Sequence, residues 1–189
     1  MRNAILISAA ALVAGLTAFQ FAASAEKGEG VRELAGALAQ ANLPLEHGIA
    51  ASAREGVPIS AKYETEDDGD ELQLSVYTMK DGSYETDAET GDVRPAQASF
   101  SEVIVDYSTG KISKVIPIQG GEDLAAARTQ RQAMAQAARS LESATAHAVT
   151  ANRGYRAVSA MPALENGHPV AKVLLLGGGE WKTVDEKLD

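Results

Sequence analysis

The hydrophobic pattern of this chain changes from helical to alternating spacing and then repeats that change, which restricts the fold to helices combined with antiparallel strands. Apolar residues recur at helical spacing between residues 31 and 55. Leu72, Leu74 and Val76 then alternate with polar neighbours, as in a half-buried strand. Helical spacing returns over residues 122–152, and further strand-like segments follow it. We therefore predict an α+β protein built from tandem units, each a helix followed by an antiparallel β-meander.

Glycine and charged residues separate the predicted elements. Gly56 ends the second helix, and Lys80-Asp81-Gly82 is a hairpin signal. Residues 84–98 are acidic and contain Pro95, and they are predicted to be an insertion or an extended hairpin. Ser140 offers a second helix start inside the long Ala-rich helical segment. The expected helices are 31–41, 45–55 and 122–152, and the expected strands are 59–64, 72–77, 100–106, 112–118, 155–164, 170–176 and 180–185.

The two halves can be overlaid with a shift of 98 residues, which places Leu43 on Leu141 and Gly56 on Gly154. Residues 180–185 also resemble residues 101–106, and both segments end on a Val-Asp pair. The resulting division is a segment 1–25, a leader and short helix at 26–42, a first unit at 43–120 with its insertion at 84–98, and a second unit at 121–189 that begins with the Ala-rich helix.

The N-terminal segment has the three-part layout of a secretory signal peptide. Arg2 precedes an uncharged, Ala-rich stretch over residues 4–19, and Ala23-Ser24-Ala25 supplies small residues before a cleavage point ahead of Glu26. The alternative is an uncleaved membrane anchor, for which this stretch is short. We expect an exported protein, periplasmic or secreted, without stable membrane insertion after cleavage.

Charge and cysteine content exclude several classes of protein. The chain has 26 acidic and 17 basic residues, for a net charge of −9. A negative balance of this size argues against a nucleic-acid partner, which requires a cationic surface. Because cysteine is absent, the chain has no disulfides, thiolate nucleophiles or cysteine-ligated metal.

No catalytic motif is present in the sequence. The three histidines, His47, His147 and His168, are too widely separated to form a helical metal-binding pair. There is no Gly-x-Ser-x-Gly elbow or P-loop, and the glycines at 177–179 precede a strand-like segment instead of a helix. We therefore expect a protein that is not an enzyme and needs no cofactor.

One acidic loop is a candidate calcium site. Five carboxylates lie within residues 66–71, around Gly69. Carboxylate oxygens are the ligands that Ca²⁺ prefers, although the spacing is not that of an EF-hand and a solvated loop tip is the alternative. The candidate ligands are Glu66, Asp67, Asp68 and Asp70.

Residues 128–156 contain five arginines and a single acid, Glu142. Such a cationic surface can contact an acidic protein partner through bidentate arginine–carboxylate pairs, or it can pair with the protein's own acidic turns. Aromatic residues on the predicted strands can contribute to the same contact or can pack inside the core. The candidate partner-binding residues are Arg128, Arg131, Arg139, Tyr77 and Trp181.

The turn after the third strand carries the most specific pattern. In Val105-Asp106-Tyr107-Ser108-Thr109-Gly110-Lys111-Ile112, Asp106 and Thr109 can accept backbone N–H groups and Gly110 can take the positive φ of a tight turn. This motif is structural and indicates a fold.

With the preceding helix and strands, this segment resembles the PepSY domain family. The resemblance covers residues 43–118 and extends more weakly over 140–189, where residues 185–189 lack the Thr-Gly of the turn. It implies a small secreted α+β module that binds or restrains a partner, as proposed for propeptides of thermolysin-like metallopeptidases, and it brings no catalytic residues. The expected function is thus a non-catalytic exported binding or regulatory protein that modulates a peptidase or another envelope partner, with calcium binding by loop 66–71 as the alternative.

Overall fold

The computed structural model describes residues 27–65, 72–82, 84–86, 93–95 and 97–189. It is an α+β structure, as predicted. The helices are α1 (Lys27–Leu38), α2 (Leu45–Ser52), α3 (Gly121–Met134) and α4 (Leu141–Ala151), and a 3₁₀ turn, Ala53–Glu55, follows α2. The strands are β1 (Val57–Thr65), β2 (Leu72–Lys80), β3 (Tyr84–Thr86), β4 (Val93–Pro95), β5 (Ser99–Val105), β6 (Ile112–Ile118), β7 (Arg156–Glu165), β8 (His168–Gly177) and β9 (Glu180–Lys187).

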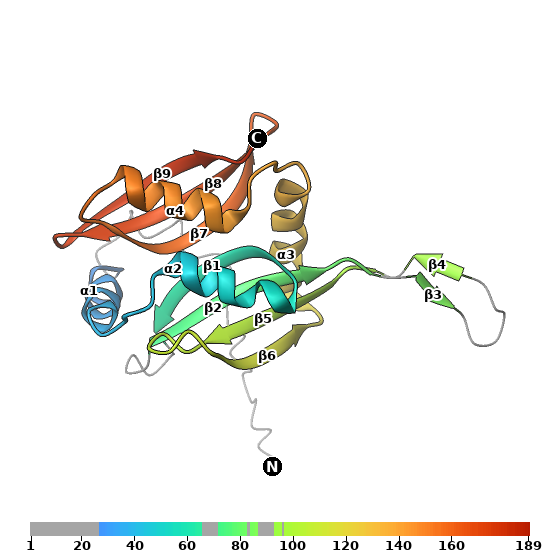
Figure 1. The fold of residues 1–189 in the computed structure, drawn as a ribbon, viewed down its shortest axis with the longest axis horizontal. Helices are drawn as coiled ribbons and strands as arrows, with labels where there is room; N and C mark the ends of the chain where they lie inside the picture. The colour runs from blue at the N-terminus through green and yellow to red at the C-terminus, as the bar shows by residue number, and fades with distance from the viewer. Residues whose placement is uncertain (1–26, 66–71, 83, 87–92, 96) are drawn as a thin grey trace, which may run out of the picture.

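Seven strands form one antiparallel sheet in the order β6-β5-β2-β1-β7-β8-β9. Neighbouring strands are close in sequence except at the centre, where β1 pairs with β7 through Ala61↔Ala160 and Lys62↔Ser159. This central pairing joins the two halves of the chain into a single sheet (Figure 1). A row of small apolar side chains crosses all seven strands at this level and consists of Val115, Val103, Val76, Ala61, Ala160, Val173 and Val184.

Helices cover both faces of the sheet. The helices α2 and α4 pack against each other and cover the face that carries this apolar row, and Leu38 of α1 joins the same core. The helix α3 packs on β1, β7 and β8. Ser60 of β1 donates a hydrogen bond to Gln130 of α3, whereas its neighbour Ala61 belongs to the apolar row. Because adjacent residues of a strand point to opposite faces, α3 lies on the face opposite to α2 and α4. We call the face that carries α3 the α3 face.

The helix predicted over residues 122–152 is in fact two helices, α3 and α4, on opposite faces of the sheet. The chain must therefore pass the end of the sheet between Met134 and Leu141. The backbone N–H groups of Ala138 and Arg139 donate to the carbonyl of Leu188 there instead of continuing a helix. Ser140 then caps α4 by accepting the N–H of Ser143 at 3.1 Å.

The 98-residue overlay of the sequence placed Leu43 on Leu141. In the structure, Leu45 is the buried first residue of α2 and Leu141 is the buried first residue of α4. The pairing of β1 with β2 is irregular between Pro58 and Ser60, and that of β7 with β8 is irregular between Ala157 and Ser159.

A backbone hydrogen bond recurs in both halves. The N–H of Leu43, two residues before α2, donates to the carbonyl of Tyr107, two residues after β5. The N–H of Arg139, two residues before α4, donates to the carbonyl of Leu188, the first residue after β9. In both halves this bond fastens the start of a helix to the end of a third strand.

The acidic insertion contributes β3 and β4, which pair with each other as a separate two-stranded sheet. The third strand of the first half is β5, which pairs with β2 from Leu74↔Val105 to Lys80↔Ser99. This agrees with the strand expected at residues 100–106. Residues 1–26, which include the predicted signal peptide, and residues 66–71 lie outside the described residues. No helix among the described residues is long and apolar enough to span a membrane.

Arg156 of β7 connects the second half of the chain to the first. Its guanidinium donates to the carbonyls of Leu38, Ala41 and Leu43 at 2.7, 3.0 and 3.3 Å. It also lies 5.5 Å from the ring centre of Tyr63, whose hydroxyl donates to the Leu43 carbonyl at 2.5 Å. Burial raises the pKa of Tyr63 to about 12, against an opposing effect of Arg156. The guanidinium therefore satisfies carbonyls at the end of α1 and in the linker to α2.

We predict that Arg156→Met lowers the free energy of unfolding by about 2–3 kcal/mol, because charged donors to partly buried carbonyls are lost. Urea denaturation measures the change. Arg153→Met is the control, because Arg153 is exposed and should change stability by less than about 0.5 kcal/mol. Equal effects of the two substitutions would contradict the role of Arg156.

Candidate functional site

The α3 face carries a group of polar side chains, one buried and four half-buried, where β1, β2 and β5 lie side by side. We call Lys62, Glu64, Ser75, Tyr77 and Glu102 the sheet-face cluster. Lys62 Nζ lies 2.5 Å from Glu64 Oε2 and 5.9 Å from the centre of the Tyr77 ring. The register places Tyr77 opposite Glu102 and Ser75 opposite Lys62. Residues from three strands thus meet on one surface.

The hydroxyl of Ser75 is committed to one of the two carboxylates in this cluster. Ser75 Oγ donates to Glu64 Oε1 at 2.8 Å and accepts from Gln73 Nε2 at 2.9 Å. The Ser75 hydroxyl also lowers the pKa of Glu102, but its one proton is donated to Glu64. Lys62 pairs with Glu64, and among the described residues Glu102 has no ion pair.

The charge of Glu102 is therefore poorly compensated. Burial raises the pKa of Glu102 most, and the negative charges of Glu64 and Asp123 raise it further. The nearby Ser75 hydroxyl and the charge of Lys62 act in the opposite direction. An ionised Glu102 is a carboxylate that would gain free energy from a donor supplied by a ligand.

A shallow hollow borders the cluster where α3 crosses the sheet. It is lined by side chains of both layers, and Ser60 Oγ donates to Gln130 Oε1 at 2.8 Å across it. Tyr77, one of the aromatic residues predicted to bind a partner, lies here, and its pKa is raised by burial and by the charges of Glu102, Glu64 and Asp123. The lining residues are Ser60, Lys62, Tyr77, Asp123, Ala126, Gln130 and Met161.

The three candidate arginines do not form one surface. Arg128 and Arg131 lie on α3, and Arg131 Nη2 lies 3.4 Å from Asp81 Oδ1. Arg139 precedes α4 and contacts β9 instead. The arginines are close in sequence but diverge in space because α3 and α4 lie on opposite faces of the sheet.

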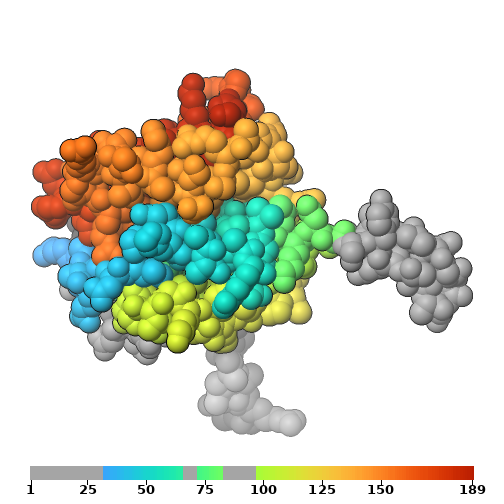
Figure 2. Space-filling view, in the orientation of Figure 1, coloured from blue at the N-terminus to red at the C-terminus, as the bar shows by residue number. Residues whose placement is uncertain are grey.

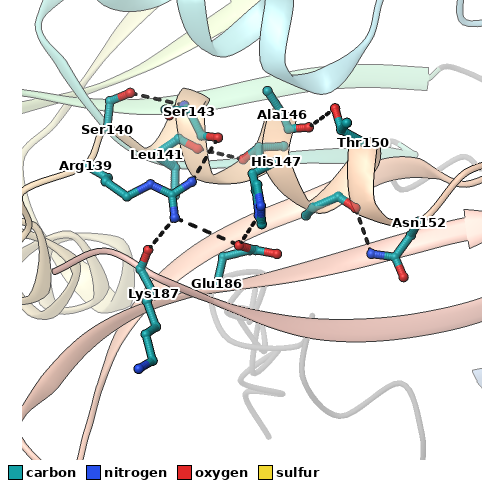
Figure 3. Close-up of polar contacts among 12 residues, drawn as sticks. Arg139, Ser140, Leu141, Ser143, Ala146, His147, Thr150, Asn152, Glu186 and Lys187 are labelled. Carbon is teal, nitrogen blue, oxygen red and sulfur yellow. Dashed lines mark hydrogen bonds and ion pairs between the residues drawn. The ribbon is translucent and has the colours of Figure 1, made fainter.

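Arg139 belongs to a cluster that fastens β9 to α4 (Figure 3). Its guanidinium donates to the Lys187 carbonyl at 3.0 Å and lies 4.0 Å from Glu186 Oε2. The same carboxylate oxygen lies 2.7 Å from His147 Nδ1. Trp181 lies on β9, where it pairs with Leu176 and is half-buried. These contacts indicate that Arg139 stabilises the packing of β9 against α4. Trp181 lies at an edge of the sheet, because β9 is an edge strand.

The Asp106 turn has the structure that its sequence predicts. Asp106 Oδ1 accepts the N–H of Ser108 at 2.8 Å, the hydroxyl of Ser108 at 2.6 Å and the N–H of Thr109 at 2.9 Å. Thr109 Oγ1 accepts the N–H of Lys111 at 3.4 Å, and Gly110 has φ +71°. These donors lower the pKa of Asp106 to about 2.

The predicted calcium ligands Glu66, Asp67, Asp68 and Asp70 fall outside the described residues, so calcium binding by this loop stays a prediction. Within the described part of the chain, no three histidine, aspartate or glutamate residues are grouped so that they could hold a metal ion.

Sequence reasoning missed most of the sheet-face cluster. The alternation of β2 places Gln73, Ser75 and Tyr77 on one face, and this signal was present in the sequence. The neighbours Glu64 and Glu102 required the strand order β5-β2-β1, which hydrophobic periodicity does not provide.

Comparison of the chain with protein-family models, with curated proteins and with solved structures found no match. The site must therefore be interpreted from its own geometry.

We predict that Asp106→Asn destabilises the protein near neutral pH and that the loss shrinks as the pH falls. A carboxylate with a lowered pKa stabilises the fold above its unfolded pKa, and this contribution disappears as the pH falls from about 4 towards 2. Urea denaturation at pH 6 and pH 3 measures both values. Ser108→Ala removes one of the donors and should show a smaller effect with the same pH trend. A loss that is equal at both pH values would be evidence against this account.

Glu102→Gln should have the opposite pH dependence. A carboxyl group with a raised pKa favours the folded state at low pH, and this advantage is lost as the pH rises through the folded-state pKa. Relative to the native chain, the Gln variant should therefore be more stable at pH 7 than at pH 4. Urea midpoints at the two pH values test this expectation, and a difference that does not change with pH would refute it.

Proposed function

We propose that this protein is a non-catalytic exported binding protein that holds a protein partner on the sheet-face cluster. The observation that carries the proposal is Glu102, a half-buried carboxylate whose pKa is raised by burial and by the charge of Glu64 and which, among the described residues, has no ion pair. A partner that supplies a donor or a positive charge would relieve this repulsion. The cluster also supplies the half-buried aromatic ring of Tyr77 and hydrogen-bonding groups beside it.

The correspondence between the halves supports two copies of one unit. Leu45 and Leu141 have equivalent places, and the hydrogen bonds Leu43–Tyr107 and Arg139–Leu188 link equivalent segments. Together with the Asp106 turn, they support a tandem PepSY-like architecture. In this proposal the partner is a peptidase or another envelope protein that the PepSY-like protein restrains, and residues 1–25 direct its export to the periplasm or the medium.

The two halves have different roles in this proposal. The sheet-face cluster belongs to the first copy, since Lys62, Ser75 and Glu102 lie on β1, β2 and β5. At the corresponding level of the second copy, Lys172 is held by Glu165 and Asp185. The carboxylates of the second copy are thus compensated by Lys172. Glu102 of the first copy has no such partner among the described residues, so we assign the binding surface to the first copy.

We predict that the tagged protein captures one envelope protein and that Glu102→Gln reduces its recovery about tenfold, the effect of about 1.4 kcal/mol of binding free energy. The measurement is capture from the native envelope fraction, with quantitative mass spectrometry. Tyr77→Phe, which removes only the hydroxyl, should give a smaller loss.

Paired substitution of Arg128 and Arg131 by Gln is the matched control, because it tests the arginines on the outer side of α3. Loss of the partner with this control but not with Glu102→Gln would move the site to α3 and overturn the proposal. An empty capture by a folded protein would also overturn it.

A further inference from the structure

We propose that the outer edge of β6 accepts a short extended segment of the partner in which apolar and acidic residues alternate. This inference rests on the proposed binding function and specifies the chemistry of the partner. Strand addition to an exposed sheet edge uses backbone hydrogen bonds for affinity and alternate side chains for specificity.

The two edges of the sheet differ in charge. The edge strand β9 has the sequence Glu-Trp-Lys-Thr-Val-Asp-Glu-Lys, with charges of both signs along its length. Such charges protect an edge against pairing with another chain. The other edge strand, β6, reads Ile-Ser-Lys-Val-Ile-Pro-Ile and carries one charge, Lys114. The edge at β6 is therefore the one open to a further strand.

The apolar row that crosses the sheet ends on β6 at Val115, whose side chain is exposed to solvent. Val103 on β5 is 0% exposed, whereas Val115, its partner on β6, is 42% exposed. Figure 2 shows the β5–β6 region at the margin of the face that α2 covers. An apolar side chain on an added strand would lie beside Val115 and continue the row, which buries apolar surface.

On the α3 face the same edge is cationic. Lys114 lies opposite Ile104, and Lys111 precedes the strand in the Asp106 turn. Neither lysine forms an ion pair within the described part of the chain, and no acidic residue lies between residues 111 and 118. Opposite charges on adjacent strands attract, and like charges repel. The position beside Lys114 therefore favours a carboxylate, which gives the alternation of apolar and acidic residues.

Pro117 limits the length of the pairing. Proline has no N–H to donate to a ladder, and Pro117 lies one residue from the end of β6. The added segment pairs with residues 112–116, which is about the length of an ordinary short strand. A ladder this short fits a partner that binds reversibly, and it disfavours growth of an extended sheet.

The test uses the purified protein and synthetic peptides in which Glu and Val alternate over six residues. Binding is measured by fluorescence anisotropy. A peptide of the same composition with its three Glu and three Val in separate blocks should bind at least fivefold more weakly. Because only alternate N–H groups of a strand face its neighbour, two N-methylated versions are compared. Methylation at one set of alternate residues should abolish binding, and methylation at the other set should leave it unchanged.

Charge reversal provides the second arm. Lys114→Glu should weaken binding of the Glu-Val peptide by up to about fivefold, the effect of one exposed ion pair, and a Lys-Val peptide should regain it. Lys187→Glu on β9 is the matched control and should leave binding unchanged. Equal loss with both N-methylated peptides, or no response to Lys114→Glu, would overturn the inference. Sedimentation that shows a dimer abolished by Lys114→Glu would replace it with pairing of two copies.

The two proposals can fail separately. If a captured partner is lost with Glu102→Gln but is unaffected by Lys114→Glu, the binding function stands and the inference about β6 is wrong. If the Glu-Val peptide binds but no envelope protein is captured, the edge of β6 can accept an added strand and the proposed function is wrong.

Discussion

The pairing of β1 with β7 is the interaction on which the rest of the structure depends. It involves Ala61↔Ala160 and Lys62↔Ser159, and it turns two β-meanders into one seven-stranded sheet. The alanines present small side chains to the face that α2 and α4 cover, and Gly48 lets α2 approach Leu74 closely. Alanines of α4 at Ala144 and Ala148 are fully buried there. Small residues at the junction allow two helices to pack together above a continuous sheet.

This junction also determines where polar groups can lie. Residues on β1 alternate between the faces, so Ala61 and Tyr63 enter the main core while Lys62 and Glu64 point to the α3 face. The helix α3 covers β1, β7 and β8, which leaves the cluster beside it half-buried. Burial there is deep enough to shift the pKa of Glu102, and the side chain remains within reach of a ligand. The candidate site is thus a consequence of a three-layer structure whose second helical layer consists of a single helix among the described residues.

Local sequence signals predicted the elements well and their arrangement poorly. The strand expected at 112–118 is β6, and the Asp106 turn has the expected hydrogen bonds, because alternation and turn chemistry are local. The arginines near residues 128–139 were expected to share a surface, but the chain changes faces between Met134 and Leu141. Likewise, no periodicity brings Glu102 beside Glu64, because their contact depends on strand order. Long-range pairing is decided by packing across the whole sheet, which a single segment does not encode.

The order of strands has a consequence for how the chain folds. Within each half, most neighbouring strands follow each other in sequence, so their loops close at small entropic cost. Residues 61 and 160 come together only at the central pairing, and contacts between such distant residues form slowly. The two meanders can therefore collapse first, each around its own helix, and dock afterwards. We therefore expect the encounter of the two meanders to limit the rate of folding, and each meander exposes an unpaired central edge until they meet.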